Sequence, residues 1–264
     1  MQAFQYHTPT DVAGAAAALG TDGARLLAGG QSLLPAMRLG LAAPEALVDL
    51  GRVPGLSAIT VDAQHVTVGA MARHAEVAAH AGVAKAIPAL ADLAGHIGDR
   101  QVRHRGTLGG SLANNDPAAC YPAGVLGLGA TVVTNRREIA ADAFFKGLYE
   151  TALAEGEVIT AVRFPIPQRA AWQKFKQPAS RFSLVGVFVS QGPAGVRVAV
   201  TGAGACVFRA TELEARLAKA WAASSLDGAS LSADGLNSDL HGSAEYRAAL
   251  IPVLAKRAVQ ASGG

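Results

Sequence analysis

The chain has 264 residues, half of them hydrophobic and 16% charged, which is enough apolar material for one large or two smaller domains. Its 23 basic and 20 acidic residues are interspersed along the chain, so the sequence shows no clustered basic patch that would bind nucleic acid. The amino terminus lacks the regions of a signal peptide, and no later window holds the roughly 20 unbroken apolar residues that cross a bilayer. Two cysteines are too few for a disulfide framework or for an iron–sulfur cluster held by this chain alone. We expect a cytoplasmic protein with no membrane span and no nucleic-acid partner.

The first hundred residues alternate short apolar runs with glycine-containing turns. Thr10 as N-cap and Gly20 as a stop predict a helix over Asp11–Leu19. The other predicted helices are 33–39, 73–80 and 88–96, and the predicted strands are 25–28, 46–50, 56–62 and 64–70. The succession from 25 to 50 is a β-α-β-like unit whose glycine turn follows its first strand, at the carboxyl end that ligands favour. The strands 56–62 and 64–70 read as an antiparallel pair.

Residues 98–117 are glycine-rich and charged, with little periodicity. Loops of that length inside a compact domain are functional or disordered, and the apolar residues here argue against disorder. Beyond it we expect strands at 130–133, 158–164, 182–190 and 195–202, and helices at 209–222 and 243–261, the last bent by Pro252. A soft domain boundary at 165–169 divides the chain into residues 1–168 and 169–264.

Two motifs pair glycines with a following hydroxyl or amide: AGGQS, Ala28–Ser32, and TLGGS, Thr107–Ser111. Glycine permits left-handed dihedrals and close approach of a ligand, and consecutive amides form a concave anion site. One such motif alone favours a structural turn. Two of similar pattern suggest the two ends of one pyrophosphate, which a dinucleotide-type cofactor would satisfy.

The common nucleotide and catalytic motifs are absent. There is no G-x-x-x-x-G-K-[ST] and no G-x-G-x-x-G that opens a long helix. The seven histidines lack H-x-x-x-H and H-E-x-x-H spacing, so no metal site is expected. Ser32 lacks a nucleophile-elbow pattern, so no catalytic residue is expected in this chain. The basic run Arg100–Arg105 fits a phosphate-steering patch and a solvated loop equally well.

Three segments, in this order, resemble the FAD-binding medium subunit of molybdenum hydroxylases of the carbon monoxide dehydrogenase and xanthine dehydrogenase type. They are LAGGQSLLP from Leu27, LVDLGRVPGL from Leu47 and QVRHRGTLGGSLANNDP from Gln101. VTGAGACVFRA, from Val200, resembles the family's carboxyl-terminal flavoprotein domain. The resemblance implies an α+β fold: a two-subdomain FAD-binding domain of the vanillyl-alcohol-oxidase (PCMH) type over 1–168, then a small α+β domain over 169–264.

The resemblance also implies a set of partners. FAD would belong to this chain, two [2Fe–2S] clusters to a small subunit, and a molybdenum–pterin cofactor to a large subunit, in a heterotrimer that dimerises. Substrate would be oxidised at molybdenum, and electrons would pass through the clusters and the flavin to an external acceptor. The chain would be an oxidoreductase subunit that orients and tunes its cofactor.

The family's cofactor contacts are carried over to matching positions. Ala28–Leu34 would wrap the pyrophosphate and ribityl, and Thr107–Ser111 would close the other side, with Asn114 nearby. Ile97 and Ile159 match apolar contacts, for which ordinary core packing stays an alternative. Lys176 matches a lysine that reaches the flavin, and a solvated lysine stays its alternative. The implied cofactor-binding residues are Ala28, Gly29, Gly30, Gln31, Ser32, Leu33, Leu34, Ile97, Thr107, Leu108, Gly109, Gly110, Ser111, Asn114, Cys120, Ile159 and Lys176.

Cys120 departs from the family pattern, which has an aspartate that accepts a hydrogen bond from the cofactor's hydroxyls. Cysteine is a weak acceptor, so this contact would be lost or taken over by Asp116, Asn114 or water. Two alternatives therefore stay open: a flavin-free scaffold of the same fold, which Cys120 supports, and a stand-alone flavin reductase or oxidase.

Overall fold

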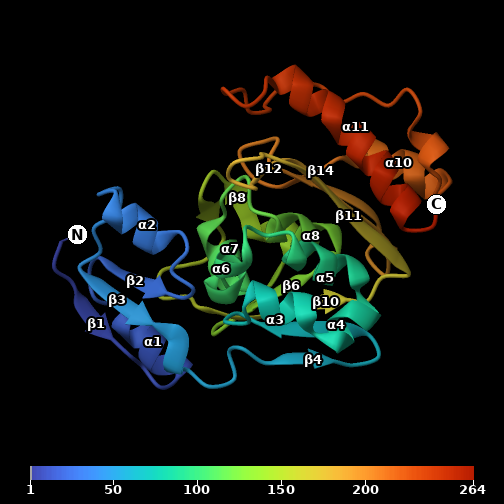
Figure 1. Ribbon diagram of the computed structural model, residues 1–264. Coiled ribbons are helices and arrows are strands. Elements are labelled where there is room, and N and C mark those ends of the chain that lie inside the picture. Colours follow the sequence, from blue (N-terminus) through green and yellow to red (C-terminus); the bar gives the residue numbers. More distant parts are fainter. Residues whose placement is uncertain (1) are drawn as a thin grey trace.

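The computed structural model, which describes residues 2–264, arranges the chain in successive layers (Figure 1). A three-stranded sheet with two helices forms a separate amino-terminal lobe. A five-stranded sheet, a layer of helices, a four-stranded sheet and a final pair of helices follow. The mixture of helices and antiparallel sheets confirms the expected α+β class.

The amino-terminal lobe is a small parallel sheet in the order β1-β3-β2. Asp11, and not Thr10, caps its first helix, because the Asp11 carboxylate accepts a hydrogen bond from the Gly14 amide at 2.6 Å. The parallel pairing of the strands on either side of α2 confirms the β-α-β unit. The elements are β1 Gln5–His7, α1 Val12–Ala18, β2 Ala24–Leu27, α2 Leu33–Arg38, β3 Ala46–Asp49 and the 3-10 turn η1 Leu50–Arg52.

The centre of the molecule is an antiparallel sheet in the order β4-β5-β10-β6-β7, covered by short helices. The pairing of β4 with β5 confirms the expected antiparallel pair. The strands are β4 Ile59–Val61, β5 His65–Gly69, β6 Thr131–Thr134, β7 Glu138–Ala140 and β10 Ile159–Pro165, and a separate hairpin joins β8 Phe145–Gly147 to β9 Glu150–Thr151. The helices are α3 His74–Ala79, α4 Ala81–Ala86, α5 Pro88–Gly95, α6 Arg100–Arg105, α7 Leu108–Asn114, α8 Tyr121–Gly127 and α9 Ala141–Phe144.

The prediction of one long loop over 98–117 is wrong, because this segment forms α6 and α7. Each helix starts at a side-chain cap: the Asp99 carboxylate accepts from the Val102 amide at 2.8 Å, and the Thr107 hydroxyl accepts from the Gly110 amide at 3.2 Å. With six and seven residues, both helices are too short to show a clear helical period. Their glycines and charges therefore looked like a loop.

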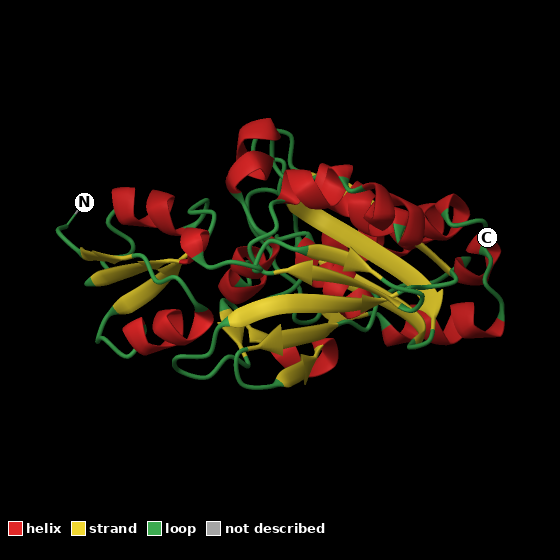
Figure 2. Ribbon diagram, turned by 90° about the horizontal axis from the view of Figure 1, so that it is seen from below, coloured by secondary structure: helices red, strands yellow, loops and turns green. Residues whose placement is uncertain are grey.

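The carboxyl-terminal part is a four-stranded antiparallel sheet between two helical layers (Figure 2). Helices α5 and α8 pack on one face, and α10 and α11 pack on the other. Strand β12 is therefore buried on both faces from Ser183 to Ser190. The elements are β11 Arg169–Lys176, β12 Ser183–Gly192, β13 Gly195–Thr201, β14 Phe208–Arg209, α10 Thr211–Lys219, the 3-10 turn η2 Ala223–Leu226 and α11 Ala244–Ala261.

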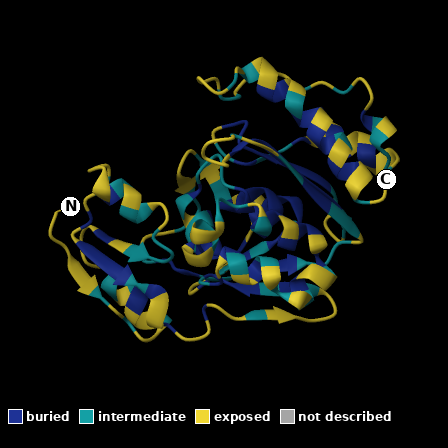
Figure 3. Ribbon diagram, viewed as in Figure 1, coloured by how far each residue is buried: buried dark blue, intermediate teal, exposed yellow. Residues whose placement is uncertain are grey.

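The main hydrophobic core runs across the predicted domain boundary. Strands β10 and β11, on either side of 165–169, belong to different sheets. However, Trp172 and Phe188 from the carboxyl-terminal sheet share one buried cluster with Val125 and Phe164. Figure 3 shows buried ribbon both in this sheet and in the helices beside it. A Cβ on Gly127 would lie 2.7 Å from the Phe188 ring, so α8 and β12 are in close contact. Over residues 2–264, no helix is long and apolar enough to cross a bilayer.

Candidate functional site

A cavity of about 960 Å³ lies where the amino-terminal lobe, the helical layer and the carboxyl-terminal sheet meet. Its wall includes residues 28–33 after β2, the start of α7, the start of β10, and Lys174 on β11. The predicted site residues that line it are Ala28, Gly29, Gly30, Gln31, Ser32, Leu33, Ile97, Thr107, Gly109, Gly110, Ser111, Asn114, Cys120 and Ile159. The fold thus gathers segments far apart in the sequence around one space.

Three predicted residues do not line the cavity. Leu108 is fully buried in the main core, and Leu34 packs beneath Gly30. Lys176 is exposed at the end of β11, where the pairing with β12 shifts register after Phe175. Lys174, before this irregularity, faces the cavity instead.

The first glycine motif, Ala28–Ser32, forms a cradle of free amides. Gly30 has φ +73°, which glycine adopts without strain. Within residues 2–264, the amides of Gly29, Gly30, Gln31 and Ser32 donate to no protein acceptor, and the Ser32 hydroxyl makes no capping hydrogen bond. Free amides in a turn that lines a cavity suit an anionic group, and the binding of a pyrophosphate by this motif stays a prediction.

The second glycine motif, Thr107–Ser111, differs from the first, although the sequence predicts a similar anion site at both. Most of its amides donate to acceptors within the protein. The Leu108 and Gly109 amides donate to the carbonyls of Ala72 and Ala70, at 3.1 and 2.7 Å. The Gly110 and Ser111 amides donate to the Thr107 hydroxyl and carbonyl, at 3.2 and 3.1 Å. Here glycine serves close packing, since a Cβ on Gly109 would lie 2.6 Å from the Ala70 Cβ. Four of the five amides of this motif are therefore used within the protein, and the Ser111 hydroxyl remains for a ligand.

The first motif packs closely against the segment that leads into the second motif. A Cβ on Gly29 would lie 2.1 Å from the Arg105 carbonyl oxygen, and one on Gly110 would lie 3.4 Å from the Ala28 Cβ. The cradle therefore sits directly against the α6–α7 junction. One bound molecule would contact both motifs.

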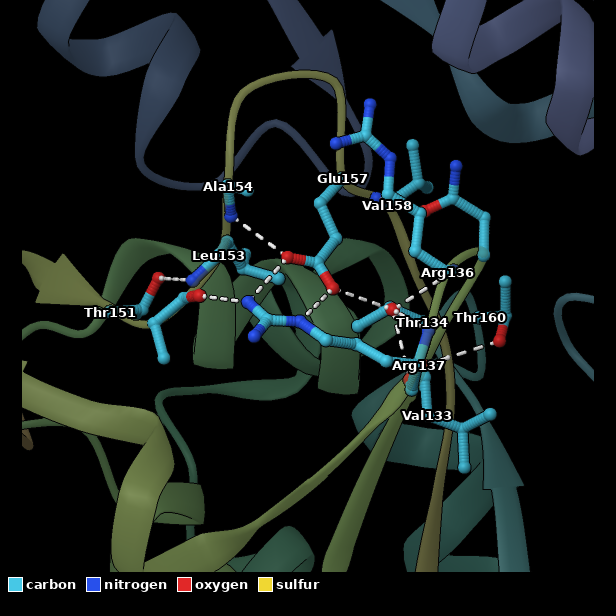
Figure 4. Close-up of polar contacts among 12 residues, drawn as sticks. Val133, Thr134, Arg136, Arg137, Thr151, Leu153, Ala154, Glu157, Val158 and Thr160 are labelled. Atoms are coloured by element: carbon cyan, nitrogen blue, oxygen red, sulfur yellow. Dashed lines mark hydrogen bonds and ion pairs between the residues drawn. The ribbon is translucent and has the colours of Figure 1, made fainter.

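A buried carboxylate holds the wall segment 153–159 in place (Figure 4). Glu157 accepts hydrogen bonds from the Arg137 Nε and Nη2 at 2.9 Å, from the Thr134 hydroxyl at 2.8 Å and from the Ala154 amide at 2.8 Å. These bonds, led by the Arg137 contact, lower the pKa of Glu157 to about 2. The carboxylate is thus ionised and fully used in fixing the backbone beside the cavity.

His74 is a cavity residue that the sequence analysis missed. It is buried, and its Nδ1 has no hydrogen-bond partner within residues 2–264. Burial, assisted by the charge of Arg103, lowers its pKa to about 4, so the imidazole is neutral at pH 7. The further missed wall residues include Tyr149, Lys174, Arg181 and Phe182, whereas Asp116, expected as a possible substitute for the family aspartate, also lines the cavity. No local spacing marks the missed residues, because they come from separate turns and strands.

The polar and apolar groups on the cavity wall fit FAD. The cradle presents amides to a pyrophosphate, Ser111 and Asn114 offer a hydroxyl and an amide, and Ile97 and Phe182 offer apolar surface for a ring. Within residues 2–264, no group of three or more His, Cys, Asp or Glu side chains is placed to hold a metal ion.

Known proteins are similar to this chain in sequence and in structure. Residues 2–167 match the family described as the FAD binding domain in molybdopterin dehydrogenase. The chain is 38% identical to the nicotine 6-hydroxylase medium subunit of Paenarthrobacter nicotinovorans, over 100% of this chain and 98% of that subunit. It is 35% identical to the carbon monoxide dehydrogenase medium chain of Hydrogenophaga pseudoflava, over 98% of this chain and 96% of that one.

Solved structures extend the match to three dimensions. A chain of carbon monoxide dehydrogenase from Hydrogenophaga pseudoflava, in a form that lacks the Mo-pyranopterin moiety, superposes with a TM-score of 0.89 at 34% identity, covering 99% of this chain and 97% of that chain. A chain of a cyanide-inactivated Cu,Mo-CO dehydrogenase gives 0.91 at 32% identity, covering 98% and 97%. These matches confirm the PCMH-type fold and FAD as the cofactor of this chain. The chain therefore belongs to the FAD-binding medium subunits of the molybdenum hydroxylases and is an oxidoreductase subunit.

Proposed function

We propose that this chain passes electrons from the [2Fe–2S] clusters of a small partner subunit through FAD to an external acceptor. Its second partner would be a large subunit with a molybdenum–pterin cofactor, in a cytoplasmic dimer of heterotrimers. The observation that carries the proposal is the free-amide cradle on a cavity lined by the amino-terminal lobe, the helical layer, strand β10 and the carboxyl-terminal sheet. The medium-subunit names of the relatives support the two partners. Bound FAD would supply the chemistry, since its ring accepts and releases electrons.

The residues of this chain would bind, orient and shield the cofactor. The amides of Gly29–Ser32 would hold the pyrophosphate, and Ser111 and Asn114 would hydrogen-bond to polar groups beside it. Ile97 and Ile159 would give apolar contacts, and Glu157 would keep the 153–159 segment in position without touching the cofactor.

Gly30→Ala tests the cradle with a matched control. Gly30 and Gly40 have nearly equal left-handed φ values, +73° and +74°, so an alanine causes similar backbone strain at each. A Cβ on Gly40 would meet no atom within 4 Å, whereas a Cβ on Gly30 would lie 2.8 Å from the Leu34 side chain. Gly30 lines the cavity and Gly40 does not. We expect the dissociation constant for FAD to be at least tenfold higher in Gly30→Ala than in Gly40→Ala. Fluorescence titration of each apoprotein with FAD measures this constant.

Gly29 is a poorer test position, because its Cβ would strike backbone atoms and disturb the fold itself. Equal FAD affinity in Gly30→Ala and Gly40→Ala would reject the cradle as the pyrophosphate site. A folded wild-type chain that releases no FAD on denaturation would favour the flavin-free scaffold. The relay is tested by adding the reduced iron–sulfur subunit anaerobically and following the loss of flavin absorbance, which a stand-alone reductase would not show.

A further inference from the structure

His74 is a cavity residue whose ring has an unpaired nitrogen. It is the first residue of α3, it lines the cavity, and its side chain is 5% exposed. Within residues 2–264, its Nδ1 is buried and has no hydrogen-bond partner. Buried polar atoms without partners are rare, because each forfeits the hydrogen bonds that it would make in water. The groups on either side of the ring therefore indicate what the imidazole does.

A second unpaired group lies beside the imidazole. Tyr121, the first residue of α8, is fully buried, and its hydroxyl has no partner in the described part of the chain. The His74 and Tyr121 rings pack against each other, with centroids 5.2 Å apart and an interplanar angle of 55°. A phenol hydroxyl donates one hydrogen bond, and an imidazole nitrogen without a proton accepts one. The two unpaired groups are complementary, so Tyr121 can donate to Nδ1 directly or through one buried water.

This pairing determines which ring nitrogen carries the proton. The lowered pKa of His74 keeps the imidazole neutral at pH 7, and a neutral imidazole has a single N–H. If Nδ1 accepts a hydrogen bond from Tyr121, the proton lies on Nε2. The nitrogen on the other edge of the ring is then an uncharged donor.

The Nε2 edge of the ring lies beside the cradle. A Cβ on Gly106 would lie 2.4 Å from Nε2, and a Cβ on Gly29 would lie 2.8 Å from the Gly106 Cα. All three residues line the cavity, so Gly29, Gly106 and the imidazole follow one another along its wall. The ring approaches this closely because Gly106 has no side chain. An anion held by the cradle amides would have the imidazole as its neighbour.

We propose that the Nε2–H of His74 donates a hydrogen bond to the pyrophosphate of bound FAD, and that Tyr121 acts as a positioning residue by donating to Nδ1. The inference rests on the proposed binding of the pyrophosphate in the cradle. It adds a side-chain donor from the helical layer to the backbone donors of the amino-terminal lobe. Hydrogen bonds to an ionised acceptor are stronger than those between neutral groups, so this contact would contribute to affinity even though the imidazole is neutral.

Replacements of His74 test the donor. Glutamine places an N–H near the position of Nε2, whereas leucine fills the space without a donor. We expect the dissociation constant for FAD to rise about tenfold in His74→Leu and less than about threefold in His74→Gln. Riboflavin has no phosphate and should bind to both variants as tightly as to wild type. Fluorescence titration of each apoprotein measures both constants.

His7 provides a matched control. It lies on β1, and its Nε2 is also buried without a partner, but it does not line the cavity. His7→Leu should leave the dissociation constants of FAD and riboflavin unchanged. An equal loss of FAD and riboflavin binding in His74→Leu would overturn the inference, because His74 would then act on the ring or on the fold and not on the pyrophosphate.

Tyr121→Phe tests the tautomer, because it keeps the ring and removes the hydroxyl. Nitrogen-15 NMR of histidine-labelled, FAD-loaded chain distinguishes a protonated ring nitrogen from a bare one. We expect the proton on Nε2 in wild type, a mixture of tautomers in Tyr121→Phe, and FAD binding weakened about threefold in that variant. A wild-type His74 with its proton on Nδ1 would overturn the inference.

The outcomes separate this inference from the proposed function. Equal FAD affinity in wild type and His74→Leu would overturn the role of His74, while a loss of affinity in Gly30→Ala would still support the cradle. A wild-type chain that binds no FAD would overturn the proposed function and the inference with it.

Discussion

At the scale of single residues, Glu157 shows how a buried charge shapes the cavity wall. Its side chain is fully buried, and four donors use its two oxygens. Glu157→Gln keeps the volume but turns an amide NH₂ toward groups that donate. We expect a loss of about 2–3 kcal/mol in the free energy of unfolding, from urea titration at pH 7. A loss below about 0.5 kcal/mol would show that the network contributes little.

The lowered pKa of Glu157 predicts that the stability of the folded protein decreases at acidic pH. The folded pKa of about 2 lies below the ordinary 4.5, so the stabilisation is complete above pH 4.5 and is lost as the pH falls toward 2. We therefore expect the stability of the wild type to fall more steeply than that of Glu157→Gln between these pH values. Parallel stability curves for the two proteins would contradict this assignment.

Positions on the cavity wall were predictable where a motif carried them. The first glycine motif, Ile97 and Cys120 line the cavity as expected, although their contacts with FAD stay predictions. Lys174 and His74 were missed, because a register shift on β11 and the packing of α3 decide which side chains face the cavity. Neither feature leaves a local pattern in the sequence.

At the scale of elements, Asn115 ties the end of α7 to the β8–β9 hairpin. It adopts φ +42°, and its Nδ2 donates to the carbonyls of Gly147 and Glu150, both at 2.8 Å. Asn115→Asp replaces these donors with an acceptor that faces two carbonyls, so hydrogen exchange should rise at residues 147–151. Asn115→Gly keeps the backbone conformation and loses the bonds without repulsion, so it should fall between wild type and Asn115→Asp. Unchanged exchange in Asn115→Asp would show that other contacts hold the hairpin.

Elements with clear turn residues at their ends followed from the sequence, and the two helices within a glycine-rich, charged segment did not. The parallel β2–α2–β3 unit and the β4–β5 pair are as expected, because each has clear turn residues at its ends. Helices α6 and α7 form because of side-chain caps and tertiary packing, which override their glycine-rich composition. The predicted helix 209–222 begins only at Thr211, because Phe208 and Arg209 pair with β13 as a short strand.

At the scale of the whole molecule, the shared core predicts that residues 2–168 do not fold alone. Removing residues 169–264 would expose the α8 face that Phe188 now covers and the part of the core that Trp172 shares. We expect the intact chain to unfold in one thermal transition, and residues 2–168 to show no cooperative transition by circular dichroism. A truncated chain that unfolds cooperatively and retains FAD would establish the predicted boundary at 165–169 as a true domain limit.

The cavity at the meeting point of the layers links cofactor supply to the amount of folded protein. A ligand that binds there contacts the lobe, the helical layer and the last sheet together, so it leaves when any of them opens. By mass action, free cofactor at a hundredfold its dissociation constant adds about 2.7 kcal/mol to the stability of the folded state. Cells short of riboflavin would hold more unfolded chain exposed to proteases. Vitamin status would thereby limit how many complete enzyme assemblies form, even with constant synthesis of all subunits.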